Sequence, residues 1–279
     1  MPDKNQPYQI LQTKLFRPRP TSDLVLRHRL IEKLDYGLQL PFILISAPSG
    51  FGKSSLVSAW IENTEIKNAW LSLDGGDSDI IQFLQYFIEA IRKEYESFNS
   101  GLFPLLDAPE LPPLEVLTTS LLNDLAGLKE EMVFVLDDYH FIHDTNVHQL
   151  IVNLMQFPVP HFHLVMTSRQ DPPFPLMEWR KKNRLIEIRM NDLIFTQEEI
   201  ITFFEKSRHF LLQQNNSQSL LNLTEGWVSG LRLLSFKIIS QEDIEKFISK
   251  HHSLDMIGLE EIVNFNQCLN IIFTLATIN

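Results

Sequence analysis

Short apolar runs alternate with amphipathic stretches over roughly the first two thirds of the chain. The apolar runs predict strands, which we place at residues 42–47, 69–73, 133–136, 162–167 and 185–188. These runs are continuously apolar rather than alternating between apolar and polar positions, so we expect a parallel sheet that is covered on both faces.

Between the strands, apolar residues recur every three or four positions, which predicts helices. The helices are expected at residues 53–63, 79–95, 114–128 and 145–157, with an earlier one starting near residue 27. Residues 98–113 are rich in Pro and predict a loop. Strands that alternate with helices predict an α/β fold, with a five-stranded, mostly parallel sheet between helices.

The pattern changes after residue 190. Thr196 and Glu199 have the spacing of a capping box, which predicts the start of a helix. Only helical patterns follow, apart from a short polar stretch at residues 213–218 that predicts a loop. We therefore predict two domains, an α/β domain over residues 1–190 and a small all-α lid domain over residues 191–279.

Charge and cysteine content exclude several classes of protein. The net charge of -11 is a poor match to a nucleic-acid backbone, so we expect no direct DNA binding. The basic stretches at residues 14–19 and 180–184 are interpreted as solvated surface or as neighbours of a phosphate. Cys268 is the only cysteine, which excludes an intrachain disulfide. No signal peptide or membrane span is predicted, so we expect a soluble, cytoplasmic protein.

Residues 47–54 read Ala-Pro-Ser-Gly-Phe-Gly-Lys-Ser and directly follow the first predicted strand. This is the spacing of a phosphate-binding P-loop, with Ala47 in place of the first glycine. The amides of such a loop and the N-terminus of the next helix favour a nucleotide's phosphates. The alternative is a chance Gly-Lys-Ser turn. The residues expected to contact nucleotide are Ser49, Gly50, Phe51, Gly52, Lys53, Ser54 and Ser55.

Two acidic residues, Asp137 and Asp138, end the predicted strand at residues 133–136 and give it the form of a Walker B strand. We assign Asp137 to Mg²⁺, together with Ser54, and Asp138 to the attacking water. In the alternative interpretation, the paired acids only cap the strand and solvate a turn.

Arg169 follows the next predicted strand, where ligands of doubly wound sheets bind. A guanidinium there can report whether a γ-phosphate is present. The alternative is that Arg169 pairs with a surface carboxylate.

Several segments carry a resemblance to a known family in addition to these motifs. They are residues 13–20, 24–27, 69–74, 134–140, 167–169 and 224–231. Together with the P-loop, they resemble the N-terminal ATPase module of the large LuxR-type transcriptional regulators, which belong to the signal-transduction ATPases with numerous domains (STAND). The resemblance covers residues 12 to 250, approximately.

The resemblance implies a nucleotide switch that uses ATP, ADP and Mg²⁺. In that family ADP holds a closed monomer, ATP with an inducer favours an open state that self-associates, and hydrolysis resets the switch. By similarity, Val25 and Arg27 would lie near the adenine and ribose, and Gly226 and Trp227 would lie in a lid over the nucleotide. The family continues into winged-helix, inducer-sensing and helix-turn-helix parts, and this chain ends at Asn279 without them. We therefore expect either a truncated gene product or a stand-alone module.

Three functions remain open from the sequence. The first is a weakly hydrolysing ATP switch module of a LuxR-type regulator that lacks its own DNA-binding domain. The second is an ordinary P-loop enzyme such as a small-molecule kinase. The third is a degenerate, non-hydrolysing remnant that acts as an interaction protein.

Overall fold

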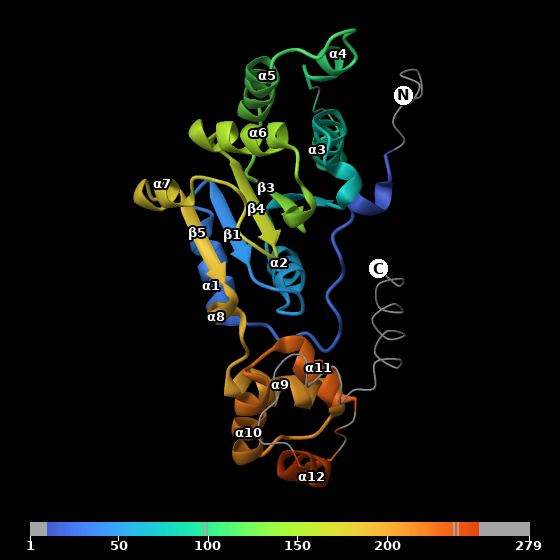
Figure 1. The fold of residues 1–279 in the computed structure, drawn as a ribbon, viewed down its shortest axis with the longest axis vertical. Helices are drawn as coiled ribbons and strands as arrows, with labels where there is room; N and C mark the ends of the chain where they lie inside the picture. Colours follow the sequence, from blue (N-terminus) through green and yellow to red (C-terminus); the bar gives the residue numbers. More distant parts are fainter. Residues whose placement is uncertain (1–9, 97, 99, 237, 239, 251–279) are drawn as a thin grey trace. The chain divides into compact units, whose positions relative to one another are not determined.

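The strands predicted from the sequence form one five-stranded sheet in the computed structural model (Figure 1). Their bounds are β1 Phe42–Ser46, β2 Lys67–Ser72, β3 Met132–Asp137, β4 Phe162–Ser168 and β5 Leu185–Arg189. The strand order is β2-β3-β4-β1-β5, and the β1–β4, β3–β4 and β2–β3 pairs are parallel. The predicted fold class, a P-loop type α/β sheet followed by a helical region, is confirmed.

The structure describes residues 10–96, 98, 100–236, 238 and 240–250. Its helices up to the end of the sheet are α1 His28–Gly37, α2 Lys53–Glu62, α3 Ile80–Glu94, α4 Phe103–Leu106, α5 Leu114–Ala126, α6 Thr145–Gln156 and α7 Leu176–Lys181. Those that follow are α8 Met190–Leu193, α9 Gln197–Arg208, α10 Gln214–Thr224, α11 Val228–Ser235 and α12 Gln241–Lys250. Three short 3-10 helices are η1 Gln12–Leu15, η2 Gly75–Asp77 and η3 Tyr139–Phe141. None of the helices described is long and apolar enough to cross a bilayer.

The described residues divide into two compact units, each assembled from separate stretches of the chain. Unit 1 contains the residues up to Arg17, Glu32–Ser46 and Trp60–Ile188. Unit 2 contains Pro18–Ile31, Ala47–Ala59 and the residues from Arg189 onward. The P-loop and the first turns of α2 therefore belong to the same unit as the C-terminal helices. The division into domains 1–190 and 191–279 stays a prediction, and Cys268 lies outside the described residues.

The core of unit 1 explains why the strands are apolar at every position. All five residues of β1 and all six of β3 are buried. On one face of the sheet, Phe134 of β3 stacks on Phe87 of α3, with ring centroids 4.0 Å apart. On the other face, Gly37 at the end of α1 lies so close to Ile43 that a Cβ at residue 37 would be 2.6 Å from its Cδ1 atom. Both faces of β1 and β3 are thus covered, as expected for this fold.

Two of the predicted loops contain helices. Residues 98–113 include the short helix α4, and the polar stretch at 213–218 is the first part of α10. In α10, Leu220 and Leu223 are buried, and Gln197 of α9 donates hydrogen bonds to the Gln214 carbonyl and the Ser217 hydroxyl. The loop prediction at 213–218 was wrong because contacts with α9 outweigh the lower helix propensity of Asn215, Asn216 and Ser217. The capping box of α9 is confirmed, with Glu199 N donating to Thr196 Oγ1 and Thr196 N to Glu199 Oε2.

Lys14 of η1 is joined to the acidic turn that follows β2. Its ammonium lies 2.7 Å from both carboxylate oxygens of Asp77 and 2.8 Å from Asp74. The Asp77 side chain is fully buried, and only 11% of the Lys14 side chain is exposed. The hydrogen bond with Lys14 is the main reason why the pKa of Asp74 lies below its usual value. The interpretation of Lys14 as solvated surface or a phosphate neighbour was wrong, because a buried carboxylate 63 residues away holds it.

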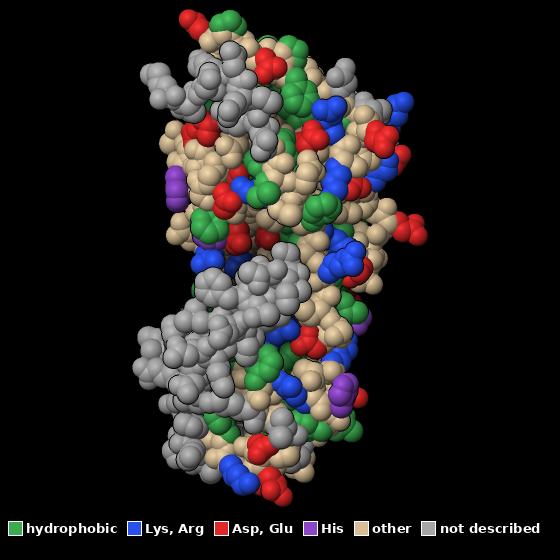
Figure 2. All heavy atoms as spheres, turned by 90° about the vertical axis from the view of Figure 1, so that its right-hand side faces the viewer, with side chains coloured by type: hydrophobic (Ala, Val, Ile, Leu, Met, Phe, Trp, Pro, Cys, Tyr) green, Lys and Arg blue, Asp and Glu red, His purple; other side chains and the backbone are tan. Residues whose placement is uncertain are grey.

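Acidic and basic side chains are interspersed on the face drawn in Figure 2, among neutral and apolar ones. The expectation that this acidic chain does not bind DNA directly stays a prediction.

We predict that Lys14→Met destabilises the protein strongly. The substitution leaves the Asp77 carboxylate buried without its cation, which typically costs about 3–5 kcal/mol. The matched control is Lys182→Met, because Lys182 pairs with Glu178 while both side chains are more than half exposed; we expect a loss of about 1 kcal/mol or less. Free energies of unfolding from urea titrations would measure both. Equal losses for the two variants would contradict this account of Lys14.

Candidate nucleotide-binding site

The P-loop leaves the sheet at Ser46, the last residue of β1, and leads into α2 at Lys53. Gly50 and Gly52 have φ angles of 81° and 75°, a left-handed conformation that glycine adopts without strain. The Gly52 carbonyl accepts a hydrogen bond from Leu56 N at 2.9 Å and so begins the helix. Lys53 is buried, and its ammonium donates to the Pro48 carbonyl at 3.0 Å. The loop therefore has the backbone form that a phosphate cradle needs.

The environments of the other P-loop residues differ. Phe51 is buried, Ser54 is half-buried, and Ser49 and Ser55 are exposed. The loop is thus anchored by Phe51, while its hydroxyl groups lie at or near the surface of the protein.

Trp227 and the N-terminus of α11 pack against the P-loop within unit 2; we refer to the described residues from Met190 onward as the lid. Ser229 N donates a hydrogen bond to the Gly50 carbonyl at 3.0 Å. A Cβ placed on Gly50 would lie 2.7 Å from Ser229 Oγ and 2.8 Å from Trp227 Nε1. Residue 50 must therefore lack a side chain both for its backbone angle and for this close approach. The resemblance placed Trp227 in a lid, and the structure shows this residue beside the P-loop.

Gly226 fixes the direction in which this lid segment runs. Its φ angle is 72°, and its carbonyl accepts a hydrogen bond from Phe195 N at 2.9 Å. A Cβ at residue 226 would lie 2.8 Å from the Phe195 carbonyl oxygen. Any side chain at Gly226 would therefore displace the segment that carries Trp227.

Arg27 joins the P-loop to the lid. Its guanidinium donates to the Gly52 carbonyl at 3.2 Å and to the Leu193 carbonyl at 2.9 Å. It also lies over the Phe195 ring, 5.6 Å from the centroid. Burial lowers the pKa of Arg27 to about 10, against the opposing attraction of Glu199. The resemblance implied a place for this residue beside the adenine and ribose, which stays a prediction. In the structure its hydrogen bonds go to the backbone carbonyls of Gly52 and Leu193.

Asp137 and Asp138 are held by one hydroxyl group in unit 1. Thr167 Oγ1 donates to Asp137 Oδ1 at 2.5 Å and accepts a hydrogen bond from Asp138 N at 3.0 Å. Asp137 is buried, whereas 38% of the Asp138 side chain is exposed. The φ angle of 60° at Asp138 turns the chain sharply at the end of β3. The two acids are thus placed differently, one fixed at the strand end and one facing outward.

The parallel register brings these groups to one edge of the sheet. Ser46 of β1 is the register partner of Ser168 of β4, and Leu136 of β3 is the partner of Met166. The carboxyl ends of β1, β3 and β4 therefore meet, which is where ligands bind in open α/β sheets. Arg169 follows β4 at this edge and is exposed.

The connecting role of Thr167 was not predicted from the sequence. The available signal was a hydroxyl-bearing residue near the end of an otherwise apolar run, one strand away from two acids. Within unit 2 the structure brings together the P-loop, Arg27 and Trp227. Within unit 1 it brings together Asp137 and Asp138, which Thr167 joins. Val25 is buried in unit 2. The ligand contacts of these residues and of Arg169 stay predictions.

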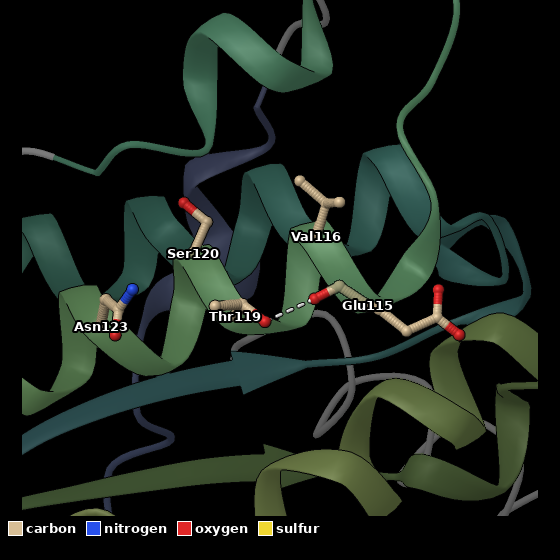
Figure 3. A pocket seen from close by; sticks show the side chains of 5 residues that line it. All are labelled: Glu115, Val116, Thr119, Ser120 and Asn123. Carbon is tan, nitrogen blue, oxygen red and sulfur yellow. Dashed lines mark hydrogen bonds between the residues drawn. The ribbon is translucent and has the colours of Figure 1, made fainter.

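A hollow of about 450 Å³ lies over α5 (Figure 3). Its lining residues all come from this helix: Glu115, Val116, Thr119, Ser120 and Asn123. The Thr119 hydroxyl donates back to the Glu115 carbonyl at 2.7 Å. Because none of the predicted site residues lines this hollow, we do not assign the nucleotide to it.

The chain is similar in sequence to transcriptional regulators. The chain is 27% identical over 227 residues to the HTH-type transcriptional regulator MalT of Vibrio cholerae, covering 81% of this chain and 25% of that protein. It is 29% identical over 226 residues to MalT of Yersinia pestis, with the same coverage. The chain thus spans about a quarter of the length of the curated relatives it matches. No family model matches it. The resemblance to LuxR-type regulators that the motifs predicted is confirmed.

A solved structure supports the fold. The Walker-type ATPase PABY2304 of Pyrococcus abyssi superposes with a TM-score of 0.56 at 14% sequence identity. The match covers 95% of this chain and 79% of that chain. At this identity the likeness concerns the fold alone, which is that of a P-loop ATPase.

We predict that Arg27→Met destabilises unit 2, because the carbonyls of Gly52 and Leu193 lose their shared donor. The buried Leu193 carbonyl loses its hydrogen bond to Arg27, whereas the Gly52 carbonyl keeps the one from Leu56 N, so the substitution should cost about 1–3 kcal/mol. The matched control is Arg232→Met, since Arg232 of α11 is 35% exposed and forms a 3.4 Å ion pair with Asp23; its loss should cost about 1 kcal/mol or less. Chemical unfolding would measure both variants. If Arg27→Met were no more destabilising than Arg232→Met, Arg27 would not be the link described here.

Proposed function

We propose that this chain is the ATP-binding switch module of an ATP-dependent LuxR-type transcriptional regulator, and that it holds its nucleotide together with Mg²⁺. The observation that carries the proposal is the pair of left-handed glycines, Gly50 and Gly52, immediately before the N-terminus of α2. This arrangement turns successive amides toward one point and adds the positive end of a helix dipole. Both features favour a polyphosphate.

The proposed roles follow from the chemistry of each group. The amides of residues 49–52 and of Ser55 line the cradle, and Lys53 reaches the β- and γ-phosphates. Ser54 and Asp137 hold Mg²⁺, which would neutralise phosphate charge when bound. Asp137 supports the assignment of Mg²⁺ to this site. Its carboxylate is buried and is held by a hydrogen bond from Thr167. Carboxylate oxygens are ligands that Mg²⁺ prefers.

Hydrolysis in this proposal is weak and serves to reset the switch. Asp138 orients the attacking water, and its partly exposed side chain is suited to contact solvent. Arg169 contacts the γ-phosphate, which only ATP carries, so the guanidinium distinguishes ATP from ADP. Val25 contacts the adenine.

A switch is favoured over a metabolic kinase by the contacts between lid and loop. Ser229 N, bonded to the Gly50 carbonyl, and Arg27, bonded to the Gly52 carbonyl, tie the lid to the same loop that would hold the phosphates. A ligand that alters this loop therefore acts on the lid directly. The curated relatives are named as transcriptional regulators, which agrees with a signalling role.

Removing the Lys53 ammonium should abolish most of the nucleotide affinity. A charge-assisted hydrogen bond contributes about 1.5–3 kcal/mol, so we expect Lys53→Ala to bind Mg-ATP about 10 to 150 times more weakly than the unchanged chain. Isothermal titration calorimetry would measure this. The control is Lys246→Ala, because the Lys246 side chain on α12 is 75% exposed, and its affinity should be unchanged. Equal affinities for Lys53→Ala and the unchanged chain would remove the basis of the proposal.

Self-association should depend on the γ-phosphate. In size-exclusion chromatography we expect a monomer with Mg-ADP and a larger species with a non-hydrolysable ATP analogue. Arg169→Ala should bind both nucleotides and remain monomeric with either, because its contact is proposed to distinguish them. Identical elution of the unchanged chain with both nucleotides would contradict the switch and leave nucleotide binding intact.

A further inference from the structure

The indole N–H of Trp227 is a buried donor whose hydrogen bond is not made within the part of the chain that the structure describes. Trp227 is 8% exposed, and its Nε1 atom has no hydrogen-bond partner there. Two other tryptophans contrast with it: Trp60 donates to Asp35 at 2.7 Å and Trp70 donates to Ser72 at 2.9 Å. Buried donors are almost always paired with protein, water or a ligand, so an unpaired one beside a phosphate-binding loop is a candidate ligand contact.

The Nε1 edge of this indole lies against the P-loop at Gly50. A Cβ on Gly50 would lie 2.8 Å from Trp227 Nε1. Two hydrogen bonds hold the backbone before and after Trp227. Phe195 N donates to the Gly226 carbonyl, and Ser229 N donates to the Gly50 carbonyl. The donor is thus held in place beside a loop of left-handed glycines, and all of these residues belong to unit 2.

We propose that Trp227 is a nucleotide-binding residue of the lid, whose indole N–H donates a hydrogen bond to a phosphate oxygen of a nucleoside diphosphate or triphosphate. The inference rests on the proposed function, since it assumes that the P-loop holds a polyphosphate. Phosphate is the favoured acceptor because the loop beside Gly50 is shaped for anionic oxygens, which make the stronger hydrogen bonds. The bound nucleotide then completes the contact between lid and loop.

The first test is Trp227→Phe, which removes the N–H and keeps an aromatic ring. We expect about tenfold weaker binding of Mg-ADP by calorimetry. The matched control is Trp179→Phe, because Trp179 of α7 is a buried tryptophan of unit 1 that packs edge-on against Phe42; it should bind Mg-ADP as the unchanged chain does.

A second readout separates a ligand contact from a structural role. Without nucleotide, Trp227→Phe loses part of a buried ring but no hydrogen bond, so its melting temperature should fall no further than that of Trp179→Phe, which loses the same part of a buried ring. The rise in melting temperature on adding Mg-ADP should be smaller in the variant. A fall in the nucleotide-free melting temperature with an unchanged Mg-ADP affinity would overturn the inference.

The unchanged chain provides the third readout, by nuclear magnetic resonance of its ¹⁵N-labelled indoles. The Trp227 signal, identified by its loss in Trp227→Phe, should move downfield with Mg-ADP and stay in place with adenosine. The same shift with adenosine would place the contact at the base and overturn the phosphate assignment, as would no shift with either.

The two proposals fail in different ways. If the unchanged chain and Lys53→Ala bind Mg-ADP equally, or neither binds it, the proposed function fails and this inference fails with it. If Lys53→Ala weakens binding while Trp227→Phe does not, only the inference about Trp227 is wrong.

Discussion

The contact between lid and P-loop depends on one residue that has no side chain. Gly50 combines a left-handed backbone with space that would be too small for a Cβ, because Ser229 and Trp227 lie under 3 Å from where that atom would be. This allows Ser229 N to reach the Gly50 carbonyl and places the Trp227 indole beside the loop. The phosphate cradle and the contact with the lid therefore both require a glycine at residue 50. A side chain at this position would disrupt both.

Buried charge supports this arrangement in two different ways. Lys14 and Asp77 form a close ion pair in unit 1 that joins the N-terminal segment to the turn after β2. Arg27 in unit 2 instead donates its hydrogen bonds to backbone carbonyls, which carry no full negative charge. Burial therefore lowers the pKa of Arg27. Both charges are costly to bury, and each favours the conformation in which its fixed partners are within hydrogen-bonding distance. For Arg27, this is the conformation in which the P-loop and the lid are joined.

The sequence was sufficient for the strands, for the long helices of the α/β part and for the P-loop, because these depend on local patterns. Continuous apolar runs identified the strands, and the glycine spacing identified the loop before α2. The sequence was insufficient where a side chain bonds to a distant backbone group. Arg27 and Leu193 are 166 residues apart, and Thr167 reaches Asp137 across 30 residues. The spacing of apolar residues along the chain does not predict hydrogen bonds between residues so far apart. Contact with α9 likewise made a helix of the polar segment 213–218, whose composition favours a loop.

The central claim is that the P-loop amides enclose phosphates while the lid remains bonded to the loop. Hydrogen exchange of individual backbone amides tests this claim most directly. On saturation with Mg-ADP, the amides of residues 50–55 and of Ser229 should all exchange more slowly, and Lys53→Ala should lose this protection at the same nucleotide concentration. Unchanged exchange at residues 50–55 in the unchanged chain at saturating Mg-ADP would contradict the account.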